Sequence, residues 1–102
     1  MDLKTTALDP LEVRVTFAPD DACFHGHFPG TPVVPGALVA GLCLHLVRER
    51  LGRGGQLMVR RFSFARFAGP GAYDLRIEER DDSCLCTLRQ GNDIFAQGRI
   101  EA

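Results

Sequence analysis

The sequence predicts a single α+β domain, residues 1–102, in which a curled antiparallel sheet of about five strands wraps around one central apolar helix. Three observations predict this class. Residues 37–47 form an almost unbroken apolar run of helical length. Short segments of alternating apolar and polar residues precede and follow that run, with turn-forming residues between them. A chain of 102 residues also fits one domain with a modest core.

The first predicted strand covers residues 11–17, where apolar side chains alternate with polar ones. The helix is predicted at about residues 35–50. Proline at position 35 suits a first helical turn, because its missing N–H would have no partner there, and Gly52 is a plausible stop. The helix is apolar on every side except at Gly41 and His45, so we expect other structure to cover it all round.

Four further strands are predicted after the helix. Short turns rich in glycine, proline and aspartate separate them, which makes them neighbours in one antiparallel meander. They cover residues 57–67, 73–77, 84–88 and 94–100. A domain this small buries its surface only marginally, so a dimer is expected.

Composition excludes several function classes. With 12 basic and 13 acidic residues the net charge is −1, which offers no general attraction to nucleic acid or to anionic membranes. The first residues lack the pattern of a signal peptide, and the longest apolar run is too short to span a bilayer. We therefore expect a cytoplasmic protein. The four cysteines lack zinc-finger or C-x-x-C spacing and are interpreted as reduced, mostly buried side chains.

A stiff, histidine-containing segment stands directly before the helix: Gly26-His27-Phe28-Pro29-Gly30-Thr31-Pro32-Val33-Val34-Pro35-Gly36. It resembles the G-H-F-P-x-x-P-V-x-P-G motif of the β-hydroxyacyl-acyl carrier protein dehydratases, which have the hot-dog fold. The resemblance covers about residues 11–101. It implies dehydration of 3-hydroxyacyl thioesters on acyl carrier protein to trans-2-enoyl thioesters, in fatty acid or polyketide-type synthesis. It implies no metal and no cofactor.

The same resemblance assigns roles to residues. His27 would be the general base, which suits an imidazole that titrates near neutral pH. The Gly36 N–H, in the first turn of the helix, would hold the thioester oxygen as negative charge develops on it. Phe28 and Ala37 would lie against the substrate. The prolines would hold His27 and the helix start in one geometry.

The sequence departs from the family pattern at one important position. The family has a carboxylate on the helix six residues after the last proline of the motif, and here that residue is Gly41. Three interpretations stay open. His45, about 6 Å further along the same helix face, or Asp20 or Asp21 replaces the acid. A dimer partner supplies it, because active sites of this kind lie between subunits. Alternatively, the protein only binds acyl thioesters. Gly41 would also widen the tunnel, which suits a bulky chain such as a polyketide or aryl-polyene intermediate.

Other interpretations carry less weight. A thioesterase of the same fold would also need the missing acid. Cys23, His25 and His27 alternate and can be read as a metal site, although the glycines and prolines favour a loop and no fourth ligand is evident. An acyl carrier protein is acidic, and the arginines that could attract it are Arg53, Arg60, Arg61 and Arg66.

Overall fold

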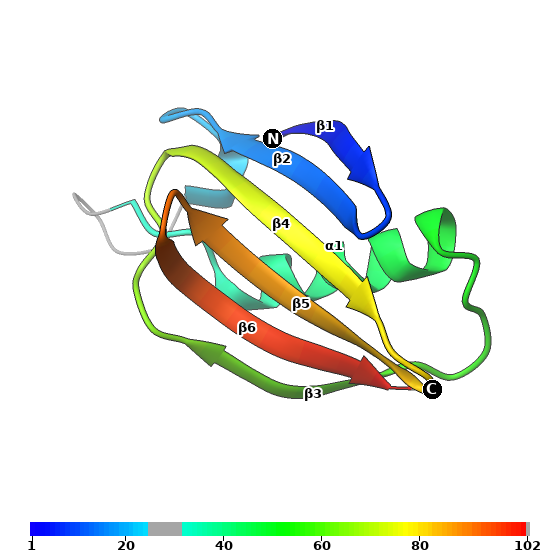
Figure 1. The fold of residues 1–102 in the computed structure, drawn as a ribbon. Coiled ribbons are helices and arrows are strands. Elements are labelled where there is room, and N and C mark those ends of the chain that lie inside the picture. The colour runs from blue at the N-terminus through cyan, green and yellow to red at the C-terminus, as the bar shows by residue number, and fades with distance from the viewer. Residues whose placement is uncertain (25–31, 102) are drawn as a thin grey trace.

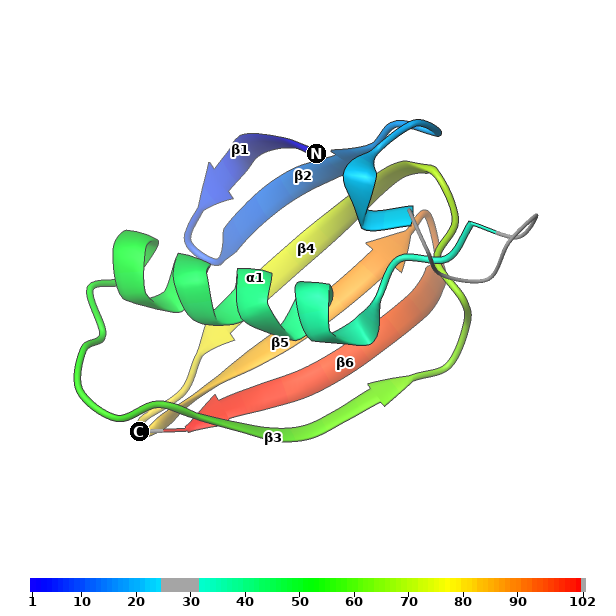
Figure 2. The same cartoon turned by 180° about the vertical axis from the view of Figure 1, so that it is seen from behind.

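The computed structural model describes residues 1–24 and 32–101 and shows an antiparallel six-stranded sheet with one long helix lying across its concave face (Figures 1 and 2). Along the sheet the strands follow the order β1-β2-β4-β5-β6-β3. The elements in chain order are β1 (Asp2–Leu8), β2 (Leu11–Phe17), the 3-10 helix η1 (Ala22–Phe24), α1 (Gly36–Arg50), β3 (Met58–Phe64), β4 (Gly71–Glu79), β5 (Ser83–Gln90) and β6 (Asp93–Glu101).

The core lies between the concave face of the sheet and one side of α1. Strand alternation sends every second side chain inward, and the register places these residues beside one another, as with Val13 opposite Leu75 and Val15 opposite Tyr73. The helix contributes its own buried side chains: Val39, Leu42, Cys43, Leu46 and Val47. The predicted class, a curled sheet around one helix, is therefore confirmed.

In the part of the chain that the structure describes, α1 is covered on one side only. Ala37, Gly41 and His45, which recur every four residues, are all exposed. The expectation that other structure covers α1 on every side is thus wrong for the single chain. The sequence of α1 looks apolar on every side because its exposed side carries the small residues Ala37 and Gly41, whose exposure to water costs little free energy. The helix ends as expected, with Gly52 at φ 66° and the Arg53 N–H donating to the Val47 carbonyl.

Strand β1 was not expected from the sequence. It pairs with β2 as the edge of the sheet, and most of its residues are exposed on both faces. A strand that faces water on both sides has no apolar alternation, so it lacks the signal on which sequence interpretation depends.

Strand β3 forms the opposite edge and contains a β-bulge. Between Arg60 and Ser63 it has one residue more than β6, and Arg61 adopts a left-handed conformation with φ 52°. The extra residue turns Phe62 toward the concave side, where its ring occupies the space above Gly98. A Cβ atom on Gly98 would lie 2.1 Å from Cδ2 of that ring. The bulge therefore keeps both Phe62 and Phe64 on the helix side.

All four cysteines are free. Cys43 on α1 packs against Cys86 on β5, and the hydrogen bond between the two thiols, together with burial, raises the pKa of Cys43. Burial likewise raises the pKa of Cys84. These residues behave as small core side chains. None of the helices in the described part of the chain is both long and apolar enough to span a lipid bilayer.

Candidate active site

The start of α1 is held against the segment that connects β3 and β4. The Val34 N–H donates to the Ala68 carbonyl at 2.7 Å, and Pro35 then caps the helix in an extended conformation with no side-chain hydrogen bond. The Pro35 carbonyl accepts the N–H groups of Leu38 and Val39. The first N–H groups of an α-helix have no partner within the helix, and the aligned peptides give this end a partial positive charge.

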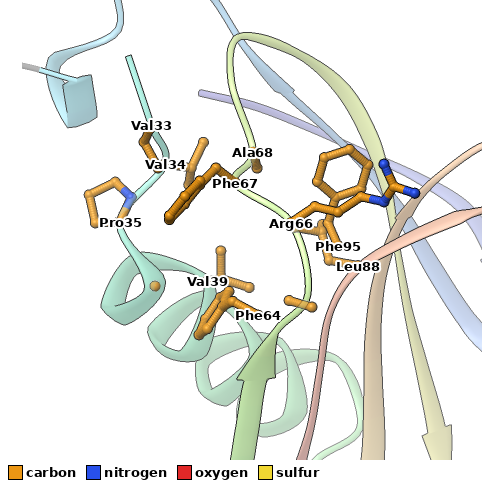
Figure 3. A pocket seen from close by; sticks show the side chains of 12 residues that line it. Val33, Val34, Pro35, Val39, Phe64, Arg66, Phe67, Ala68, Leu88 and Phe95 are labelled. Carbon is orange, nitrogen blue, oxygen red and sulfur yellow. The ribbon is translucent and has the colours of Figure 1, made fainter. Parts of the chain in front are cut away.

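A cavity of about 310 Å³ opens beside this helix start (Figure 3). Its size is at the lower end of the range for ligand pockets, roughly 300–1,000 Å³. Its walls are almost entirely apolar. The lining residues come from the motif and α1 (Val33, Val34, Pro35, Gly36, Val39), from β3 and the following segment (Phe64, Arg66, Phe67, Ala68), and from β5 and β6 (Leu88, Phe95, Ala96).

Two phenyl rings make the mouth of this cavity. Phe64 is 46% exposed and Phe67 81% exposed, and Figure 3 shows them facing Val39 and Pro35 across the opening. Phe64 also lies against Gly36, where an added Cβ would come within 2.9 Å of its ring. Glycine at this position therefore lets an aromatic ring and the helix start approach each other closely.

The cavity contains no acid among its described lining residues. Arg66 is the charged residue among them, and its guanidinium points away from the opening, where it pairs with the exposed Asp93 at 3.6 Å.

Asp21, considered above as a replacement for the missing acid, does not line the cavity. It makes an ion pair with the Met1 amino group and accepts the Cys23 N–H. These interactions keep the pKa of Asp21 below its ordinary value.

The structure brings only some of the sequence-predicted site residues together. Gly36 lines the cavity, while Ala37, Gly41 and His45 lie on the exposed side of α1 and do not line it. Among the described residues, no side chain comes within 4 Å of a Cβ added to Gly41, so the position of the missing acid has no described neighbour. His27 and Phe28 lie outside the described residues, and so does His25 of the alternative metal site. In the described part, no cluster of potential metal ligands occurs.

Sequence reasoning missed the aromatic residues of the cavity. These are Phe64 and Phe67, at and just after the end of β3, and Phe95, near the start of β6. The two segments are far apart in sequence, and only the sheet order brings them beside the helix start. The phenylalanines between residues 62 and 67 were the available signal.

The predicted arginine patch is largely neutralised, since Arg53 pairs with Glu79 and Arg60 with Glu101.

A sheet curled around one helix is the architecture of the hot-dog fold, and here an apolar cavity lies at the start of that helix. Solved structures share the fold. One is the dehydratase heterocomplex ApeI:P from Xenorhabdus doucetiae, with a TM-score of 0.82 at 20% identity, covering 99% of this chain and 93% of that chain. Another is an uncharacterised protein from Erwinia carotovora subsp. atroseptica, with a TM-score of 0.71 at 23% identity over 99% and 89% of the two chains.

The family of this chain is identified by a match of its sequence to a family model. The model of the ApeI-like family, described as ApeI dehydratase, matches residues 4–99. The chain therefore belongs to the ApeI-like dehydratase family. Among curated proteins, none matches the chain significantly.

Proposed function

We propose that this protein acts in the dehydration of 3-hydroxyacyl thioesters carried on acyl carrier protein, giving trans-2-enoyl thioesters. The observation that carries the proposal is the apolar cavity of about 310 Å³ that reaches Gly36 at the start of α1. An acyl chain can lie between Phe64, Leu88 and Phe95, with its thioester at the helix end. Membership of a dehydratase family supports the reaction type.

The proposed chemistry uses two groups of this chain. The neutral His27 imidazole removes a proton from C2 of the acyl chain, and the electrons move toward the thioester oxygen. The Gly36 N–H donates to that oxygen. Because the surrounding walls are apolar, little water screens this interaction, which strengthens it as charge develops. The C2–C3 double bond then forms as the 3-hydroxyl leaves with a proton, as water.

The proton for the leaving hydroxyl comes from outside this chain in our proposal. The described lining residues offer no carboxyl group, and Gly41 presents an empty, exposed position on α1. A partner chain seated against this face can place an acid there. The space at Gly41 also suits a bulky or rigid acyl chain, of the polyketide or aryl-polyene kind, at the junction of the two chains.

The test follows the loss of water from a 3-hydroxyacyl carrier-protein substrate by mass spectrometry. We expect turnover on addition of a carboxylate-bearing partner of the same fold, and we expect His27→Ala to abolish it. His25→Ala is the matched control and should retain turnover, since a metal site of Cys23, His25 and His27 would lose activity in both variants. Turnover that survives His27→Ala would refute the assigned base.

A second candidate function is acyl binding without catalysis. It is favoured by the lack of an acid among the described lining residues, because loss of one positioned acid typically costs about 10²–10⁴-fold in rate. The same assay separates the two. A chain that binds the acyl carrier-protein substrate but gives no product, with or without a partner, has only the binding function.

A further inference from the structure

Tyr73 is a buried residue beside the acyl cavity that the proposed chemistry leaves unused. It lies on β4 and is 3% exposed, and it is the one tyrosine in a chain with seven phenylalanines and no tryptophan. Another phenylalanine would serve for packing alone, because a buried hydroxyl costs free energy unless it makes a hydrogen bond. Here the hydroxyl donates to the Gly69 carbonyl at 2.8 Å. Its partner therefore lies in the segment that connects β3 and β4.

The same segment holds the start of α1. The Ala68 carbonyl accepts the Val34 N–H at 2.7 Å, and both residues line the cavity (Figure 3). Two residues after Val34, the helix begins at Gly36. The planar peptide that joins Ala68 to Gly69 contains the Ala68 carbonyl, so a shift of Gly69 also moves that carbonyl. The Tyr73 hydroxyl thus acts on the helix start through two successive hydrogen bonds.

The Tyr73 ring is held on two sides. It packs edge-on against Phe95, with the ring centroids 5.1 Å apart, and against Phe17 at 6.1 Å. The Phe95 ring lines the cavity, and the Phe95 carbonyl accepts the N–H groups of Ala65 and Arg66 at 2.9 and 3.4 Å. Tyr73 itself is not among the described lining residues. Because the ring is fixed by packing, removal of the hydroxyl alone leaves the cavity wall in place.

We propose that Tyr73 is a positioning residue of the acyl site, whose hydroxyl fixes the segment that sets the Gly36 N–H. This role rests on the proposed function, because that function assigns the Gly36 N–H to the thioester oxygen. Tyr73 touches neither the acyl chain nor the reacting atoms, so loss of its hydroxyl should slow the chemical step and leave acyl binding largely unchanged. Misplacing a reacting geometry by about 1 Å can cost about 100-fold in rate.

The first measurement compares Tyr73→Phe with Ile77→Val, a matched control on the same strand. Ile77 is 1% exposed and is not among the described lining residues, and loss of its methyl group should lower stability about as much as loss of one hydrogen bond. Hydrogen exchange of the Val34 amide is followed by NMR and divided by that of the Ile100 amide, which lies on β6 between β5 and β3. This ratio corrects for the global change in stability.

We expect the corrected exchange of the Val34 amide to be about fivefold or more faster in Tyr73→Phe, because the segment that accepts its hydrogen bond opens more often. Ile77→Val should leave this ratio at the wild-type value. Equal ratios in the two variants would overturn the proposal.

The second measurement is the dehydration assay with the carboxylate-bearing partner. Tyr73→Phe should lower kcat about tenfold or more while KM changes by less than about twofold, and Ile77→Val should change neither. A raised KM with unchanged kcat would assign Tyr73 to acyl binding and would also overturn the proposal. Absence of turnover in the wild type would refute the proposed function, whereas the exchange of the Val34 amide would still decide whether Tyr73 positions the helix start.

Discussion

Replacing Gly98 by alanine tests how the bulge of β3 is held. The added Cβ would lie 2.1, 2.4 and 2.4 Å from Cδ2, Cε2 and Cγ of the Phe62 ring. Carbon atoms in ordinary contact are about 3.5–4.0 Å apart, so the ring must move by more than an ångström. Because the clash is with the base of the ring as well as its side, a small rotation does not relieve it.

The expected cost is the balance of two terms. Overpacking of this kind typically costs about 1–3 kcal/mol. Alanine is favoured over glycine within a strand by roughly 0.5–1 kcal/mol, which offsets part of it. We therefore expect a net loss of about 1–2 kcal/mol in the free energy of unfolding for Gly98→Ala. For a domain of this length, that lowers Tm by roughly 4–8 °C.

Urea denaturation of four proteins measures the effect: wild type, Gly98→Ala, Phe62→Ala and the double variant. If the phenyl ring causes the loss, Gly98→Ala should cost nothing further once Phe62 is alanine. Gly41→Ala is the matched control. No atom of residues 1–24 or 32–101 lies within 4 Å of its added Cβ, and helix propensity favours alanine by about 1 kcal/mol, so it should stabilise the protein. Additive effects of Gly98→Ala and Phe62→Ala would refute the reasoning.

Three more predictions concern the site and the core. Gly36→Ala should push the half-exposed Phe64 ring outward, changing stability by less than about 1 kcal/mol while lowering dehydration tenfold or more; unchanged kcat/KM would contradict the assigned position of the acyl chain. Cys23 should react first with a thiol reagent in the native protein, and Cys43, Cys84 and Cys86 only on unfolding, as mass spectrometry of the labelled peptides would show; early labelling of Cys43 would contradict its burial. Tyr73→Phe removes the hydrogen bond to the Gly69 carbonyl and should cost about 1 kcal/mol. Because burial raises the pKa of Tyr73, the native state holds that proton more tightly, so wild-type stability should fall as pH rises above about 10, and urea titrations should show a smaller fall in Tyr73→Phe.

Sequence patterns identified the elements that bury one face. In strand β2, the alternating apolar residues predicted from the sequence are the ones that pack under α1. The bounds of α1 were also predictable, because Pro35 before the helix and Gly52 after it mark its two ends locally. Strand β1 gave no such signal, because it faces water on both sides. The exposed side of α1 was misread because alanine and glycine look apolar in sequence yet are tolerated at a surface.

The sequence by itself determined five of the six strands, the helix and the motif before it, because periodicity and turn chemistry act between residues close along the chain. Only the tertiary structure decided which of them meet. Phe62 contacts Gly98 and Phe64 contacts Gly36 because the sheet order places β3 beside β6 and because β3 contains a bulge. No local sequence pattern predicts that bulge. The cavity follows from those long-range contacts, since it needs side chains from segments that are distant in sequence.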